Sequence, residues 1–157
     1  MRRFILAGLI LLVAAGLWAQ SGDQQIVGIE TGVVFAYNMD PANEGLGVGQ
    51  SMTINLTVAP SVQAGFTYVD GDGANMPNQT LLRIHYFVAR QIGLSVAAGI
   101  SGGNAAAGIG IFANAFGQTF QNTLFTAFGI RIDYTLDTTL GLDAGLLTFG
   151  LAAKVGM

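Results

Sequence analysis

Six ionisable residues are placed where they could act together, because each lies in a segment that alternates large apolar residues with small or polar ones. They are Glu30, Arg83, His85, Arg131, Asp133 and Lys154. Arg83 and His85 are two positions apart, as are Arg131 and Asp133, and residues two apart on a β-strand point to the same face. Such a set could form ion pairs, gate a path for small solutes or, beside a nucleophile, support catalysis.

The elements that carry these residues are predicted from a period of two, which is typical of strands. In residues 26–38 the odd positions from Val27 to Tyr37 are mostly large, and the even positions are mostly small or polar. The other alternating segments are residues 50–59, 62–69, 80–90, 92–101, 105–116, 123–136 and 139–157. In every segment that contains one of the six residues, that residue lies opposite the large apolar side chains.

These segments predict eight antiparallel strands if residues 139–157 form one strand. The phase changes inside that segment, since Leu140 and Leu142 lie on even positions and the later large residues on odd ones. A bulge near residues 143–145 would absorb the shift. A turn there, together with another strand near residues 105–123, would give ten strands instead.

The predicted connections alternate in length, which is typical of transmembrane barrels with long outer loops and short periplasmic turns. Residues 39–49 and 70–79 are long and acidic, whereas the turns at residues 60–61 and 90–91 are short. Residues 117–122 are long for a periplasmic turn, and the connection before the last strand is short for an outer loop. Asp70-Gly71-Asp72 lacks the closing acidic residue of a calcium loop and is expected to be a solvated outer loop.

Composition indicates that the large residues face lipid. Charged residues make up 10% of the chain, against about 25% in soluble domains, so a soluble barrel would expose a surface of Gly, Ala, Ser and Thr with few charges. One Arg or Lys facing lipid at mid-depth costs about 2–4 kcal/mol, and Arg83, Arg131 and Lys154 all lie on the other face. A helical membrane protein is the alternative for the uncharged residues 91–130, but Gly102-Gly103-Asn104 interrupts them and their period is two.

Residues 1–19 are predicted to be a cleaved signal peptide. Arg2 and Arg3 precede an apolar run from Phe4 to Leu17, and Ala19 is a candidate cleavage residue. The alternative is a retained helix, but the run is short for a bilayer core of about 30 Å. Residues 20–157 then form one barrel domain with four basic and nine acidic residues, a net charge of −5 that argues against nucleic acid as a partner. The absence of cysteine excludes disulfides and a lipid-anchored cysteine.

With this signal peptide and these strands, the chain resembles the small bacterial outer-membrane β-barrels of the opacity-protein and outer-membrane-protein-A-like type. The last strand, Phe149-x-Leu151-x-Ala153-x-Val155-x-Met157, resembles the C-terminal signal that the outer-membrane assembly machinery reads, although that signal usually ends in an aromatic residue. The resemblance implies residence in the bacterial outer membrane. It also implies contact with membrane lipids, including lipopolysaccharide or an equivalent outer-leaflet lipid, and with the assembly machinery during insertion.

We therefore expect an all-β, up-and-down transmembrane barrel whose six ionisable residues form a polar network in the lumen, as a plug or a gate. The hypothesis pairs Glu30 with Lys154 across the seam where first and last strands meet, with Arg83, His85, Arg131 and Asp133 clustered above. The expected role is structural or in surface interaction, with no cofactor or metal, and a narrow channel for small solutes is the alternative.

A lipid A-modifying enzyme is a further alternative that the sequence disfavours. It would need a serine, a histidine and a carboxylate that lipid can reach, whereas His85 is predicted inside. The chain also has no Gly-x-Ser-x-Gly elbow. Tyr37, Tyr68 and Tyr134 fall near the expected outer ends of their strands on the lipid face, where an aromatic girdle belongs.

Overall fold

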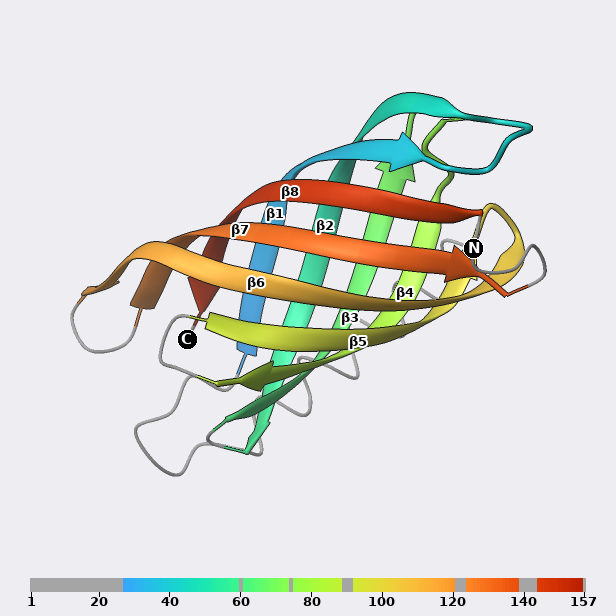
Figure 1. Ribbon diagram of the computed structural model, residues 1–157. Helices are drawn as coiled ribbons and strands as arrows, with labels where there is room; N and C mark the ends of the chain where they lie inside the picture. Colours follow the sequence, from blue (N-terminus) through green and yellow to red (C-terminus); the bar gives the residue numbers. More distant parts are fainter. Residues whose placement is uncertain are drawn as a thin grey trace, which may run out of the picture.

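Eight antiparallel strands close into a barrel in sequence order, and β1 pairs with β8 to complete it (Figure 1). The computed structural model describes residues 27–59, 61–73, 75–88, 92–120, 124–138 and 144–156. The strands are β1 (Val27–Asn38), β2 (Gly45–Ala59), β3 (Val62–Gly71), β4 (Gln79–Phe87), β5 (Ile92–Ser101), β6 (Asn104–Phe120), β7 (Leu124–Asp137) and β8 (Gly145–Gly156). The predicted eight-stranded up-and-down barrel is confirmed, and the ten-stranded alternative is wrong.

The two faces of the sheet differ in polarity, as the alternation of apolar and polar residues predicted. Phe35, Ile84 and Ile132 are 49%, 54% and 41% exposed on the outside of the barrel. Thr53 and Asn55, by contrast, are buried inside it. Apolar side chains outside and polar ones within are the arrangement of a transmembrane barrel, because hydrocarbon replaces water as the outer solvent.

The connections divide between the two ends of the barrel. At one end, here called the loop end, β1, β3, β5 and β7 end and β2, β4, β6 and β8 begin. At the other, the turn end, β2, β4 and β6 end and β3, β5 and β7 begin. The alternation of longer and shorter connections holds except at Gly102-Gly103, where positive φ angles of 58° and 95° allow a very tight turn. Over the described residues, the structure contains no helix with the length and apolarity needed to cross a membrane.

Strand β2 begins five residues earlier than predicted, so the expected loop at residues 39–49 ends at residue 44. Gly45 pairs with Asn38, and Gly47 and Gly49 are buried on the inner face. Alternating glycines usually indicate a loop. Here they form the wall against which Met76 packs, because a Cβ at Gly47 would lie 2.7 Å from the Met76 Cβ.

The boundaries of β6 and β8 also differ from the prediction. Strand β6 runs to Phe120 through a register shift between Ala115 and Gln118, so residues 117–120 of the connection expected at residues 117–122 belong to a strand. Residues 121–123 lie outside the described residues. Strand β8 begins at Gly145, so residues 139–157 do not form one long strand. Residues 139–143, with Leu140 and Leu142, lie outside the described residues, as do the predicted signal peptide, the Arg90-Gln91 turn and the final Met157.

Candidate functional site in the barrel lumen

The strand register brings the predicted ionisable residues into one part of the lumen. On β4, Arg83 and His85 are buried. Asp133 of β7 lies opposite Gly110 of β6, which in turn lies opposite Ser95 of β5. A Cβ at Gly110 would collide with the Asp133 carboxylate and lie 2.8 Å from the Ser95 hydroxyl. The missing side chain at Gly110 therefore makes the room in which Asp133 reaches its partners.

A chain of ion pairs crosses the lumen. Arg83 Nη1 lies 2.8 Å from Asp133 Oδ1, and Ser95 Oγ donates to the same oxygen at 3.4 Å. Arg131 Nη2 lies 3.2 Å from Glu30 Oε1, and Arg131 Nε lies 4.0 Å from Asp133 Oδ2. The side chains of Arg83 and Asp133 are only 4% and 6% exposed. Each charge therefore depends on its partner, since an unpaired charge in such a place is costly.

The predicted ion pair between Glu30 and Lys154 is wrong, because each residue has a different partner. The two residues are opposite each other across the β1–β8 seam, but the Glu30 carboxylate pairs with Arg131. Arg131 of β7 lies opposite Gly150 of β8 in the strand register, and its guanidinium extends past β8 to reach β1. Lys154 Nζ instead donates to Gln63 Oε1 at 3.3 Å.

His85 lies among aromatic side chains rather than in the ion-pair chain. It is 2% exposed, and its ring packs edge to face on Phe112 at a centroid distance of 5.2 Å. Phe112 packs in the same way on Phe87 at 5.1 Å, and Lys154 Nζ lies 5.8 Å from the centre of the Phe87 ring. Within the described chain, neither ring nitrogen of His85 has a hydrogen-bond partner.

Serine, histidine and aspartate meet in this region without the connections of a catalytic triad. Ser95 is the strand neighbour of His85, but its hydroxyl donates directly to Asp133. A triad needs serine bonded to histidine and histidine bonded to the carboxylate. In the described residues no group of three or more His, Cys, Asp or Glu side chains is placed to hold a metal ion.

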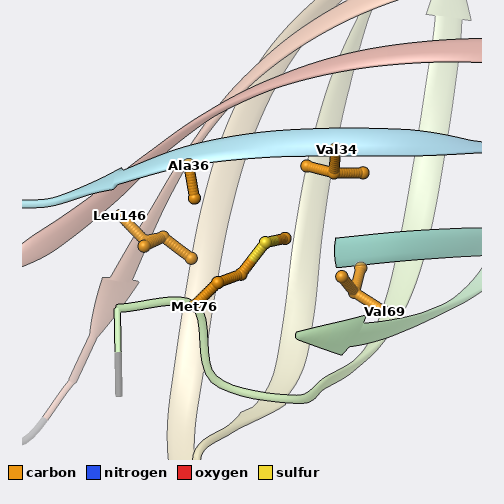
Figure 2. Packing of buried hydrophobic residues seen from close by; sticks show 5 residues of the cluster. All are labelled: Val34, Ala36, Val69, Met76 and Leu146. Atoms are coloured by element: carbon orange, nitrogen blue, oxygen red, sulfur yellow. The ribbon is translucent and has the colours of Figure 1, made fainter. Parts of the chain in front are cut away.

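Sequence reasoning missed an apolar cluster that fills the lumen nearer the loop end. Figure 2 shows Met76 directed into the barrel among Val34, Ala36, Val69 and Leu146. Met76 is fully buried, although it belongs to the connection of residues 72–78 that was expected to be a solvated loop. A lone methionine among polar residues is the one signal in the sequence that could have indicated it.

Beyond this cluster, the loop end carries a hollow of about 310 Å³ with a polar rim. Its lining includes the side chains of Asp40, Asp137, Asn43 and Asn104, and Leu146 links it to the apolar cluster. Asp40 already accepts from the Ala42 amide and the Asn43 side chain. The Asn104 amide donates to Asp137 at 2.7 Å. The rim of the hollow is therefore tied together by its own hydrogen bonds.

Comparison with known proteins gives structural likeness only. The chain shares 16% identity with a structure described as de novo design of transmembrane beta-barrels, over 85% of this chain and 98% of that one, with a TM-score of 0.48. It shares 13% identity with Neisserial surface protein A from Neisseria, over 83% of this chain and 96% of that one, with a TM-score of 0.44. No protein-family model and no curated protein matches the sequence.

Proposed function

We propose that the chain is an integral barrel of the bacterial outer membrane with a structural or surface-interaction role, its lumen closed by its own side chains. The apolar exterior supports membrane residence, because water would leave that surface as one large exposed apolar patch. Closed barrels of alternating lipid-facing and lumen-facing residues are found in outer membranes. The predicted signal peptide at residues 1–19 would bring the chain there, and lipopolysaccharide or an equivalent outer-leaflet lipid would surround the loop end.

The observation that carries the closed lumen is the filling of the barrel at two successive levels. Met76 and its neighbours occupy the inside nearer the loop end, and the ion pairs Arg83–Asp133 and Arg131–Glu30 cross it further in. An eight-stranded barrel has an interior just wide enough for side chains. A solute would have to displace both levels to pass.

With the lumen closed, the loops are the part of the protein that would contact partners outside the barrel. Asp40, Glu44, Asp70 and Asp72 lie at or beside the loop end, and Glu44, Asp70 and Asp72 are exposed. The Tyr37 hydroxyl donates to Glu44, which ties the end of the β1–β2 connection to strand β1. Such an acidic, ordered surface suits a structural contact or a partner with basic groups better than a nucleic acid.

Single-channel recording in planar bilayers tests the closed lumen. The refolded full chain is expected to show no steady openings. Repeated openings of uniform size that the charge-removing variant Arg83→Met changes in amplitude would overturn the proposal and favour the narrow channel for small solutes. Residence in the outer membrane is tested separately by cell fractionation together with heat-modifiable migration on a denaturing gel, which a folded barrel is expected to show.

A non-enzymatic role is part of the proposal. It is supported by the position of His85 inside the barrel, away from any lipid substrate, and by the direct Ser95–Asp133 bond. Lipid A extracted from expressing cells is expected to have an unchanged mass spectrum. A new acylated or deacylated species that disappears with His85→Phe would show that the lumen residues do catalyse a reaction.

A further inference from the structure

The hollow at the loop end brings residues that are distant in the sequence around one space. Its volume is about 310 Å³, and its lining includes Asp40 after β1, Asp137 at the end of β7 and Leu146 of β8. Pockets for small ligands typically measure about 300–1,000 Å³. The hollow therefore has room for a small molecule or for one long side chain of a partner.

The charged groups around this space are negative. Asp40 and Asp137 contribute carboxylates to the lining, and none of the described lining residues is basic. The Asp40 carboxylate accepts from the Ala42 amide and from the Asn43 side chain, which are both neutral donors. These bonds hold the carboxylate in place without cancelling its charge. A cation that enters the hollow would meet a preorganised counter-charge.

The inner part of the hollow contains a buried hydroxyl group without a partner. Thr135 of β7 is 3% exposed and belongs to the lining. Within the described residues its hydroxyl makes no hydrogen bond. Buried polar groups are nearly always satisfied, and a hydroxyl oxygen can accept as well as donate. A ligand that carries N–H groups would satisfy it.

Another part of the lining is apolar. Leu146, which is 5% exposed, and Pro77 contribute aliphatic side chains. No aromatic side chain is among the lining residues that the structure describes, so a ring-shaped ligand has no surface to stack on. The described residues also contain no group of three or more His, Cys, Asp or Glu side chains placed to hold a metal ion. An aliphatic cation suits this lining better than a ring or a metal.

We propose that the hollow binds a primary ammonium group on a short aliphatic stem, supplied by a free alkylamine or by a lysine side chain of a partner. An ammonium carries three N–H donors, and Asp40, Asp137 and Thr135 offer acceptors for them. The stem contacts Leu146 and Pro77. The proposal gives the surface-interaction role a partner chemistry and rests on that role, because the loop end must face outward to meet such a group.

Isothermal titration calorimetry of the refolded full chain in nanodiscs of a zwitterionic lipid tests the site, with empty nanodiscs as the baseline. The probe is butylammonium chloride, compared with sodium chloride at the same ionic strength. The parent chain is expected to bind butylammonium saturably. Asp40→Asn should weaken this binding about ten-fold or more, because charge-assisted hydrogen bonds are the strong ones. Asp70→Asn, which removes an exposed carboxylate outside the hollow, is the matched control and should bind as the parent chain does.

The proposal is overturned by an absence of binding above the baseline, by an Asp40→Asn variant that binds like the parent chain, or by an equal loss in Asp70→Asn. The last result would mean that the acidic end attracts cations without a site. If Asp40→Asn does not refold, Thr135→Val decides: a loss of about three- to ten-fold supports the site, and unchanged binding overturns it.

A second probe, the methylamide of Nα-acetyl-lysine, distinguishes the two sources of the ammonium group. Binding as tight as that of butylammonium supports a partner's side chain, and weaker binding supports a free amine. Cell fractionation tests the surface role separately. A barrel that reaches the outer membrane but gives no calorimetric response would therefore overturn the site and leave the proposed function standing.

Discussion

Removing the Asp133 carboxylate should cost the barrel a large part of its stability. Asp133→Asn keeps the shape of the side chain but leaves the Arg83 guanidinium, 4% exposed, without its 2.8 Å counter-ion. Arg131 at 4.0 Å loses part of its balance as well. Breaking a buried ion pair by removing one partner costs about 3–5 kcal/mol. Folding stability is typically about 5–15 kcal/mol, so the variant should lose a substantial share of its stability.

A double-mutant cycle separates this ion pair from a general loss of packing. Arg83→Met should cost about as much as Asp133→Asn, because it leaves the Asp133 carboxylate with only the Ser95 hydroxyl and, at 4.0 Å, Arg131 Nε. Arg83→Met combined with Asp133→Leu should cost less than either single change, since replacing a whole buried pair by apolar residues is often neutral. The assay is urea unfolding of refolded protein, followed by the heat-modifiable gel shift.

The control for this cycle is Asp70→Asn, which should change stability by no more than about 0.5 kcal/mol because the residue is exposed. Two results would refute the reasoning. One is an Asp133→Asn variant as stable as the control. The other is a double variant that costs the sum of the single costs, which would mean that Arg83 and Asp133 do not depend on each other.

Three further changes test other parts of the barrel by the same assay. Ile84→Arg on the exterior should lower the folding stability by about 2–4 kcal/mol in a bilayer, against less than about 1.5 kcal/mol for Ile84→Leu. Equal losses would argue that Ile84 does not face lipid. Gly110→Ala should cost about 1–3 kcal/mol, because its Cβ collides with Asp133, and an unchanged stability would show that the carboxylate moves freely. Met76→Ala should lower the folding stability by about 2–5 kcal/mol through the cavity that it leaves, whereas Met76→Leu should be nearly neutral. A Met76→Ala variant of unchanged stability would mean that the residue does not fill the lumen.

The sidedness of the barrel was predictable because two independent constraints agree. The period of two puts Arg83 and Lys154 opposite the aliphatic residues, and the cost of a charge in lipid decides which face turns inward. The same pattern favoured eight strands and left ten as the alternative, because the phase change within residues 139–157 could be a bulge or a turn. These are local properties of each segment, so they need no knowledge of which strands meet in space.

The partners inside the lumen were not predictable in the same way. Glu30 of β1 pairs with Arg131 of β7 across the intervening strand β8, so this contact depends on the registers of three strands together. Met76 enters the barrel because Gly47, in a stretch that reads as a loop, leaves room for it. A glycine in a strand marks a space, but only the fold shows which distant side chain fills it.

Closure of the cylinder also constrains how the chain can fold. The pairing of β1 with β8 places Gly28 opposite Gly156 and Asn38 opposite Leu146, so it forms only after nearly the whole polypeptide has been brought together. Contacts so far apart in sequence slow folding, since the entropy of the intervening chain is lost before they form. Until then two unpaired strand edges stay open to other molecules, and the yield of refolded protein should fall as its concentration during refolding rises.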